Sequence, residues 1–388
     1  MDKKQRDQYR MRIKKGILAE CLLVVMAVAV LAGQRGRLEE RRAAGSSVLA
    51  IEEDYIKWVD FTVSYEALCS AYEWDVKTHG TEHEVHWVEL LAYTAAKTGG
   101  AFDKSALKTM EKAAQALSEG EKTLEELTEK LQYYPYYLDA YDAAIGGLVG
   151  EYEEDSGNGH YESKYGLKGY FPLARGFDYT HYDDFGVSRS YGYKRRHLGH
   201  DMMGLVGTPI MCIESGTVEA LGWNQYGGWR IGIRSFDGKR YYYYAHLRQN
   251  FPYALDLKEG SVVTAGDVIG YMGHTGYSTV ENTNNIETVH LHWGLQLIFD
   301  ESQKEGNNEI WVDCYALTRF LYKNRSLTEK NTETKEWFRH FQMKDPAAEE
   351  YKKQAAAPQK APSDPSSDKT AAILPQNIEY PSLFRTIY

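Results

Sequence analysis

Cysteine is scarce in this chain of 388 residues, and basic residues do not outnumber acidic ones. The four cysteines are widely scattered and form no CxxC pair, which argues against a disulfide framework and a thiolate zinc knuckle. Lys and Arg number 45 against 55 Asp and Glu, so the chain is poorly suited to gripping nucleic-acid phosphates. Apolar residues make up 43% and charged residues 26%, a balance that excludes a wholly disordered chain and a multi-span membrane protein.

An apolar run over residues 16–33 comes directly after a basic tail, residues 1–15. At ~1.5 Å per residue a helix over this run is roughly 27 Å long, close to the ~30 Å of a hydrocarbon core. The positive-inside rule then keeps the tail in the cytoplasm and places everything after residue 33 outside. A cleaved signal peptide is the alternative, because Val30-Leu31-Ala32 resembles a cleavage site. We predict a retained transmembrane anchor, since the run exceeds the usual ~7–15-residue signal core.

Residues 47–151 predict a small α-helical domain. Apolar residues recur there every three to four positions, and Thr123 with Glu126 forms a capping box. Three neighbouring histidines raise the alternative of a metal site. A solvated loop between helices is favoured, because no carboxylate lies at a matching helical spacing on the same face, so we expect no chemistry in this domain. The three histidines are His79, His83 and His86.

Residues 197–325 change to a β pattern. Short runs of β-branched and aromatic residues are separated by glycine turns, and Asp237-Gly238 between two such runs indicates a hairpin. Because no helix-length pattern separates the runs, we predict an antiparallel sheet. Before this domain, the Gly- and Tyr-rich residues 152–196 predict irregular structure; after it, residues 345–375 predict a disordered, proline-rich tail. The expected fold class is therefore α+β multidomain, with a transmembrane helix, a small all-α domain and an antiparallel all-β domain.

Half of the twelve histidines lie within the β region. His197 precedes Asp201 by four residues, and nearby glycines and a proline argue that the pair converges through a turn entering a strand rather than on a helix. His290 and His292 lie two apart, so in a strand both imidazoles face the same side. His246 comes after the tyrosine-rich run. Zinc accepts nitrogen and oxygen ligands, and a catalytic site uses three of them and leaves a fourth position open. Two histidines and one carboxylate meet that need.

Together these residues and their surroundings resemble the LytM- and lysostaphin-type zinc endopeptidases, which cut the peptides of peptidoglycan. The resemblance covers roughly residues 196–299 and implies a LytM-like fold for the β domain. It implies that His197, Asp201 and His292 bind Zn²⁺ and that His246 and His290 are unliganded catalytic histidines. The motifs that carry it are HLGHD, GTP, ESGTV, YAHL, KEGSVVTAGDVIGYMGHTG and VHLHW.

Within this family pattern, His290 is the expected general base. His246 is expected either to hold the reacting partner in its orientation or to stabilise the oxyanion. The assignments of His290 and His246 could also be exchanged. His200 and His274 are expected not to bind the metal. The polar residues 277–289 form a longer insertion than the family usually has, so the resemblance does not indicate which peptide bond is cut. Residues 152–196 are expected to cover the site.

The sequence therefore predicts a single-pass membrane enzyme of the bacterial cell wall. It places the N-terminus in the cytoplasm and a zinc metalloendopeptidase outside, with peptidoglycan peptides as substrate, the membrane as a partner through residues 16–33, and no nucleic acid. No protein partner of the helical domain is indicated. A non-catalytic wall-binding or scaffold protein of a division or sporulation complex is the alternative. A zinc carboxypeptidase or amidase with the same type of site is a third possibility.

Overall fold

The computed structural model describes residues 55–157, 159–190, 194–304, 306 and 308–356. The predicted tail and anchor, residues 1–15 and 16–33, lie outside this range. No helix among the described residues has the length and apolar character needed to cross a bilayer. The described residues from Ile56 onward belong to one compact unit, which contains both the helical region and the sheet region of the sequence.

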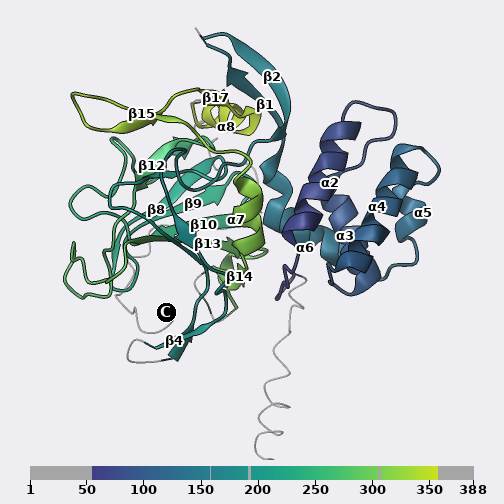
Figure 1. The fold of residues 1–388 in the computed structure, drawn as a ribbon, viewed down its shortest axis with the longest axis horizontal. Coiled ribbons are helices and arrows are strands. Elements are labelled where there is room, and N and C mark those ends of the chain that lie inside the picture. Colours follow the sequence, from purple (N-terminus) through teal and green to yellow (C-terminus); the bar gives the residue numbers. More distant parts are fainter. Residues whose placement is uncertain (1–54, 158, 191–193, 305, 307, 357–388) are drawn as a thin grey trace, which may run out of the picture. The chain divides into compact units, whose positions relative to one another are not determined.

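Five helices occupy the first part of this unit (Figure 1). The predicted capping box is present, because the Thr123 side chain accepts from the Glu126 N–H and the Glu126 side chain accepts in return. Residues 55–64 are not helical, although they belong to the region predicted to be helical; helix α2 begins where Ser64 caps it. The helices are α2 (Tyr65–Thr78), α3 (Trp87–Thr98), α4 (Lys104–Ser118), α5 (Leu124–Thr128) and α6 (Tyr134–Ile145).

An eight-stranded antiparallel sheet carries the predicted β region. Its order is β11-β8-β9-β10-β13-β6-β3, and β14 also pairs with β13. The predicted hairpin at Asp237-Gly238 joins β9 to β10. The strands of this sheet are β3 (Thr180–His181), β6 (His200–Met203), β8 (Gly216–Asn224), β9 (Gly228–Ser235), β10 (Arg240–Ala245), β11 (Val262–Val263), β13 (His290–Leu297) and β14 (Ile310–Val312).

Residues 152–196, predicted to be irregular, contain short strands instead. Gly157 and Gly159, both at positive φ, belong to the turn that joins β1 to β2, and β17 completes their sheet from far along the chain. The prediction was wrong because β1 and β2, VGEYEED and YESKYGL, pair as a hairpin but are largely polar and lack the alternating apolar pattern that indicates strands. The remaining strands are β1 (Val149–Asp155), β2 (Tyr161–Leu167), β4 (Ser188–Ser190), β5 (Lys194–Arg196), β7 (Pro209–Met211), β12 (Val268–Tyr271), β15 (Thr328–Lys330), β16 (Trp337–Arg339) and β17 (Met343–Lys344).

The predicted disordered tail also begins as ordered structure. Helix α8 spans Pro346–Ala356; the rest of the predicted tail lies outside the described residues. Asp345 accepts from the backbone N–H of Ala347 and forms an ion pair with Lys168, so it provides both a helix cap and an anchor. Proline at the first helical position is favourable, whereas the composition alone suggested a flexible segment. The other helical elements are η1 (Gly146–Leu148), η2 (Glu301–Gln303) and α7 (Tyr315–Leu321).

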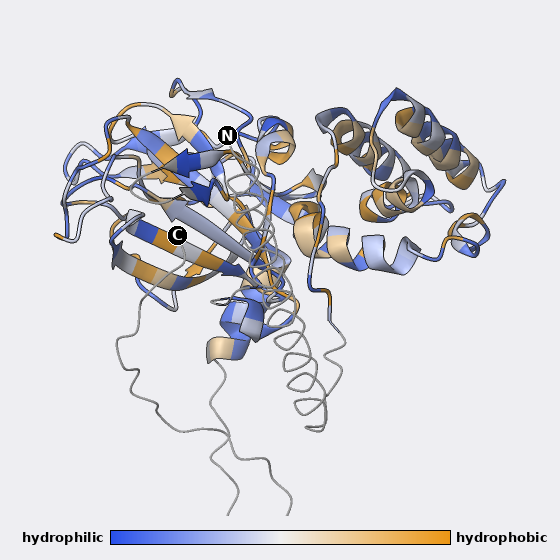
Figure 2. Cartoon of the chain, turned by 90° about the horizontal axis from the view of Figure 1, so that it is seen from below, coloured by the Kyte–Doolittle hydropathy of each residue, from blue (hydrophilic) through white to orange (hydrophobic). Residues whose placement is uncertain are grey.

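One hydrophobic core runs through the helices and the large sheet, and Figure 2 shows apolar segments on both. The contact between them includes a buried charge. Arg240 on β10 is 2% exposed, and its Nη1 donates to the carbonyls of Asp142 and Ala143 in α6 at 2.9 and 3.1 Å. Its Nε donates to Glu214 at 2.7 Å. Helix α6 is therefore attached to the sheet by hydrogen bonds as well as by apolar packing.

Candidate metal centre

The pairing of β6 with β13 places the key side chains. Asp201 and His292 are directly opposite each other in the antiparallel register, so their side chains lie on the same face of the sheet. His197 lies in the turn that leads into β6. Gly199 in this turn is required by space, because a Cβ there would come within 2.5 Å of the His292 ring. The HLGHD motif thus provides two candidate ligands and the clearance for the third.

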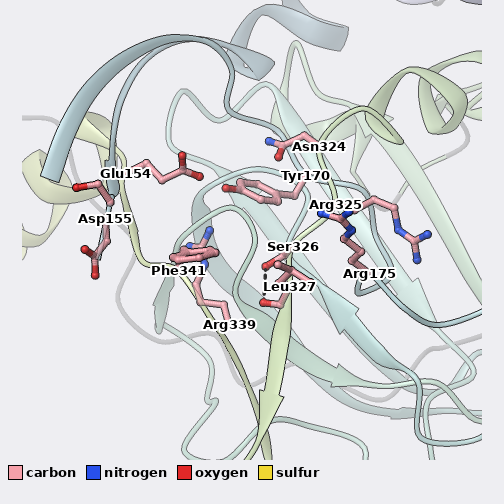
Figure 3. Close-up of a pocket in the computed structure, with 11 residues that line it drawn as sticks. Glu154, Asp155, Tyr170, Arg175, Asn324, Arg325, Ser326, Leu327, Arg339 and Phe341 are labelled. Carbon is pink, nitrogen blue, oxygen red and sulfur yellow. Dashed lines mark hydrogen bonds between the residues drawn. The ribbon is translucent and has the colours of Figure 1, made fainter. Parts of the chain in front are cut away.

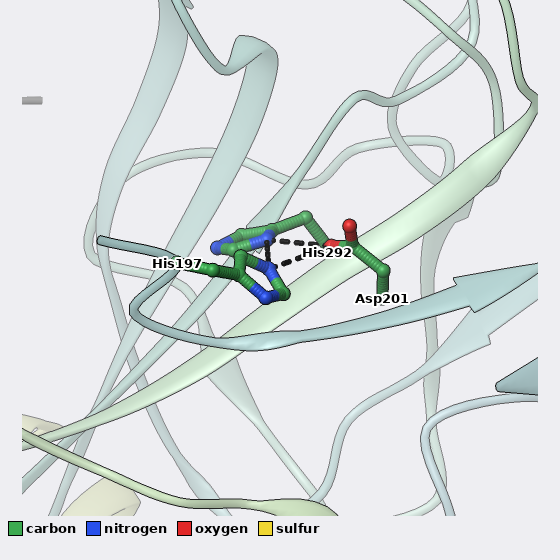
Figure 4. Close-up of side chains that lie close together, drawn as sticks. All are labelled: His197, Asp201 and His292. Carbon is green, nitrogen blue, oxygen red and sulfur yellow. Dashed lines mark hydrogen bonds and ion pairs between the residues drawn. The ribbon is translucent and has the colours of Figure 1, made fainter. Parts of the chain in front are cut away.

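His197, Asp201 and His292 converge on one point (Figure 4). His197 Nε2 lies 3.1 Å from Asp201 Oδ1 and 3.1 Å from His292 Nδ1, and His292 Nδ1 lies 2.8 Å from Asp201 Oδ1. Ligands of tetrahedral zinc at 2.0–2.1 Å from the ion are separated by roughly 3.3 Å. The three atoms therefore have nearly the spacing of one face of a zinc tetrahedron. Among the described residues, this is the group of histidine, cysteine and carboxylate side chains that fits a metal ion.

The protonation states of this cluster suit a cation. Burial by itself would raise the pKa of Asp201, but hydrogen bonds from His197 and His292 outweigh it and hold that pKa well below its usual range. Burial lowers the pKa of His292. The carboxyl group is therefore ionised and the His292 imidazole neutral at physiological pH, which are the forms that coordinate metals.

Two residues that the sequence did not single out orient this cluster from outside. His197 Nδ1 lies 3.3 Å from the carbonyl oxygen of Asp184 and 3.1 Å from its carboxylate. Nδ1 of His197 thus faces the Asp184 oxygens, with Arg189 Nη2 3.2 Å away, and its Nε2 points toward Asp201. Arg189 on β4 donates from Nη1 to Asp201 Oδ2 at 2.7 Å and also pairs with Asp184. Outer partners of this kind fix the tautomer and orientation of metal ligands. Neither residue belongs to a motif, so the sequence contained no signal for them.

His246 and His290 lie beside the cluster. Their ring centroids are 4.7 Å apart, and the His246 centroid is 5.9 Å from that of His292. Nδ1 of His246 is 3.0 Å from the Thr275 carbonyl and Nδ1 of His290 is 2.8 Å from the Thr288 carbonyl. A carbonyl only accepts, so both Nδ1 atoms carry hydrogen and both Nε2 atoms are bases. Burial lowers the pKa of His246 well below its usual value, which keeps this imidazole neutral.

The backbone of His246 has φ of +61°. This left-handed conformation is unfavourable for a residue with a Cβ. It is held by backbone hydrogen bonds on both sides, from His246 N–H to Gly227 and from Gly273 N–H to the His246 carbonyl. Strained backbone held by its surroundings is a common feature of functional sites.

The two histidines expected not to bind metal have other partners. His200 alternates with Asp201 along β6 and so faces the opposite side of the strand. Its Nε2 is 2.8 Å from Nδ1 of His181, and burial lowers its pKa to about 3. Nδ1 of His274 is 2.8 Å from the carbonyl oxygen of Ile286. Neither belongs to the cluster of three candidate ligands.

The insertion 277–289 borders the site, as its position predicts. Tyr277 stacks toward His246 with ring centroids 6.1 Å apart, and the guanidinium of Arg195 lies 4.9 Å from the Tyr277 ring centroid. Asn282 holds the loop in place, because its Oδ1 accepts from Trp229 Nε1 at 2.8 Å and from the Asn250 N–H at 2.8 Å. Tyr277 and Asn282 are further site residues that the sequence placed in the loop without assigning a role to either.

Comparisons with known proteins agree with this geometry. The model of peptidase family M23 matches residues 195–305. The L-Ala–D-Glu endopeptidase of Bacillus subtilis is 34% identical over 155 residues, which are 40% of this chain and 45% of that protein. Lysostaphin of Staphylococcus simulans is 38% identical over 98 residues, which are 25% of this chain and 17% of that protein. The chain thus spans less than half the length of these curated relatives.

Solved structures similar to this chain include two with related names. A Ruminococcus gnavus protein named as lytM covers 66% of this chain and 88% of its own length, at 26% identity and a TM-score of 0.45. The catalytic domain of Staphylococcus simulans lysostaphin covers 36% of this chain and 92% of its own length, at 29% identity and a TM-score of 0.29. The family match, residues 195–305, includes every residue of the HLGHD and VHLHW motifs. Residues 195–305, which contain the candidate metal centre, thus match peptidase family M23, and this β domain is similar to endopeptidases of the LytM and lysostaphin type.

Proposed function

We propose that this chain is a membrane-anchored zinc metalloendopeptidase that hydrolyses peptide bonds of bacterial peptidoglycan outside the cytoplasm. One observation carries the proposal. Nε2 of His197, Oδ1 of Asp201 and Nδ1 of His292 lie 2.8–3.1 Å from one another, and the imidazoles of His246 and His290 lie beside them. The family match of residues 195–305 and the names of the relatives, which are endopeptidases, support the peptide bond as target.

The donor set fits zinc. Two imidazole nitrogens and one carboxylate oxygen are common protein ligands of catalytic zinc, and three of them leave a fourth position for water or substrate. His197, Asp201 and His292 would hold the ion. A zinc ion at this point supplies a Lewis acid that polarises the scissile carbonyl and makes water reactive near neutral pH.

The chain's own residues then move the proton. We assign the general base to His290, which shares a strand face with His292 and has an unprotonated Nε2. It takes the proton of the attacking water and delivers it to the nitrogen of the leaving amine. His246 presents its Nε2 from the other side and orients the reacting groups. Its neutral state at physiological pH results from burial, so it accepts a hydrogen bond rather than adding a positive charge to the site.

The site's place in the cell is part of the proposal. Residues 1–15 are basic and residues 16–33 are apolar, an order that retains the tail in the cytoplasm and exports the chain beyond residue 33. A peptidase acting on the cell wall requires that exported side. The support here comes from the sequence, since both segments lie outside the described residues.

The test uses the full chain in detergent. Zinc content is measured after purification, and purified peptidoglycan is digested with release of peptides monitored by mass spectrometry. Wild type is expected to bind about one zinc per chain and to release fragments whose masses identify the bond cut. His292→Ala is expected to lose both, and His274→Ala, a matched histidine of the same region, is expected to keep both. Zinc-loaded wild type that releases no fragments would favour the non-catalytic scaffold, and fragments cut at an amide to sugar or at a peptide terminus would favour the amidase or carboxypeptidase.

A further inference from the structure

A polar cavity of about 370 Å³ lies between the β1–β2 turn and the segment after α7 (Figure 3). Its wall includes Arg175, Arg325 and Arg339, together with Tyr170 and Ser326. None of its lining residues lies on β6 or β13, the strands that carry the candidate metal ligands. The cavity volume is within the range of small-molecule sites in proteins.

The positive charges of this wall are only partly compensated. Arg325 donates to the carbonyls of Ala174 and Phe177 and has no carboxylate partner among the described residues. Its guanidinium also lies 5.1–5.7 Å from the ring centroids of Phe171, Tyr179 and Tyr322. The guanidinium of Arg175 is exposed and has no hydrogen bond or ion pair with any residue that the structure describes. The N–H of Arg175 donates to the carbonyl of Ser326 at 2.8 Å. Because Ser326 follows Arg325 directly, this bond keeps the backbones of the two arginines close together. Two adjacent cations therefore lack a counterion from the described part of the chain.

Buried hydrogen-bond donors at the same place also lack acceptors. Nε of Arg325 and Nε of Arg339 are buried without a hydrogen-bond partner in the described ranges. Arg339 is only 4% exposed, and its Nη1 contacts the Asp267 carboxylate at 3.3 Å. The buried Ser326 hydroxyl makes a long 3.4 Å contact with the adjacent carbonyl. Buried donors normally have acceptors, but these two Nε atoms are closed off from solvent, so the donors left for a ligand in the cavity are Arg175, the remaining N–H groups of Arg325 and the Ser326 hydroxyl.

Two carboxylates at the far side of the cavity limit the charge of that ligand. Glu154 and Asp155 line the opposite wall in Figure 3. Glu154 forms an ion pair with Lys164, and Asp155 accepts from the Gly157 N–H. Both carboxylates still repel any negative charge of the ligand beyond the one that the arginines bind. A compact ligand with one anionic group therefore fits better than a polyanion such as a phosphate polymer.

We propose that this cavity binds a carboxylate, as at the C-terminus of a short peptide, through Arg175, Arg325 and the Ser326 hydroxyl. Guanidinium groups match the planar, two-oxygen geometry of a carboxylate. Leu327 and Phe341, both exposed at the edge of the cavity, provide apolar contact for the rest of the ligand. The site is separate from the candidate metal centre and does not depend on the proposed hydrolysis.

The experiment compares two ligands that differ only in the charged group, N-acetyl-D-alanine and its amide. Binding to the full-length chain is measured by ligand-observed NMR titration in EDTA, so that a carboxylate cannot bind at a metal. N-acetyl-D-alanine is expected to bind and the amide is not. Arg175→Gln is expected to weaken binding by about tenfold or more, because a hydrogen bond to a charged group is lost. Its side chain is exposed and unpaired among the described residues, so the fold is expected to survive.

Lys104→Gln, which removes an exposed cation from α4, is the matched control and is expected to bind like wild type. Ser326→Ala is a second, independent probe of the wall and is expected to weaken binding less than Arg175→Gln. Equal binding of acid and amide, or unchanged binding in both cavity variants, would overturn the proposal. Binding of inorganic phosphate without binding of N-acetyl-D-alanine would overturn the carboxylate assignment.

Discussion

The two ends of strand β10 show two different ways to bury polar groups. At one end, the Arg240 side chain makes five hydrogen bonds, to Glu214, Asp237 and the carbonyls of α6. Donors there meet acceptors, and positive charge meets negative charge. At the other end, Ala245 pairs with His292, where two imidazole nitrogens and a carboxylate oxygen face one another. A neutral imidazole has only one N–H group, so His197 and His292 can each donate at most one hydrogen bond there.

The difference separates an ionic network that holds structure from a cluster whose atoms fit a cation. Both are buried, and both contain a carboxylate that pairs with an arginine, Glu214 with Arg240 and Asp201 with Arg189. Only the second brings three metal-ligating atoms to one point. This convergence of ligand atoms distinguishes the candidate functional end, and substitutions can test each end separately.

The largest expected effect is on hydrolysis at the histidine end. His290→Ala is expected to keep its zinc and to lose activity by about 10²–10⁴-fold, the usual contribution of general acid–base catalysis. His246→Ala is expected to behave in the same direction. Zinc content and the rate of peptide release are measured on the same preparation. Loss of zinc in His290→Ala would show that His290 is a ligand and that the assignment of base and ligand is reversed.

The opposite end should respond in stability and not in metal binding. Arg240→Ala leaves Glu214 buried without its partner, so we expect the free energy of unfolding to fall by roughly 3–5 kcal/mol. Urea unfolding provides the measurement, and zinc binding below the transition is expected to stay intact. The neighbouring Lys239→Ala removes a more exposed ion pair with Asp142, and a change within about 1 kcal/mol is expected. Equal decreases in the free energy of unfolding of the two variants would show that Arg240 contributes no more to stability than the more exposed Lys239.

An intermediate effect is expected just outside the ligand cluster. Asp184→Asn removes the carboxylate that faces His197 Nδ1, which weakens both the orientation and the basicity of that ligand. Zinc affinity, measured by competition with a chelator, is expected to fall by about 10–100-fold. Asp183→Asn changes an exposed neighbour and serves as the matched control. Unchanged affinity in Asp184→Asn would restrict the site to its three ligands.

At physiological pH, where His200 is neutral in both states, its effect is the smallest of the four, and it becomes visible as a pH dependence of stability in acid. His200 has a pKa of about 3 in the folded chain and about 6.5 when unfolded. The unfolded state thus binds more protons between these values, and stability falls as the pH drops below the unfolded pKa. The expected slope is about 1.4 kcal/mol per pH unit from this group. His200→Gln, studied in EDTA, should unfold with a shallower pH dependence; identical slopes would contradict the buried neutral state.

Local signals were enough to predict much of the fold. The capping box at Thr123 and the hairpin at Asp237-Gly238 depend on residues within a few positions of each other, and both were confirmed. Strands β1 and β2 were missed although they pair locally, because their residues are largely polar and show no alternating apolar period. Helix α8 was missed because proline was counted as a sign of disorder, whereas here it begins a helix.

The site divides in the same way. The family resemblance carried by the HLGHD and VHLHW motifs predicted His197, Asp201 and His292 as one ligand set, and the structure brings these side chains together. Asp184 and Arg189 act on that cluster from a hairpin without a recognisable pattern, and only the folded backbone places them there. Roles that depend on tautomer, such as those of His246 and His290, rest on carbonyls of Thr275 and Thr288, whose positions the sequence does not specify.

The attachment of Arg240 to α6 has a practical consequence for anyone truncating this protein. A fragment limited to the family-matched residues 195–305 would discard the carbonyls of Asp142 and Ala143 that receive its guanidinium. It would also remove Phe171 and Leu173, both fully buried against the sheet. Expression of that fragment should yield aggregates, whereas a chimera that exchanges the catalytic module must carry helix α6 along as part of the graft.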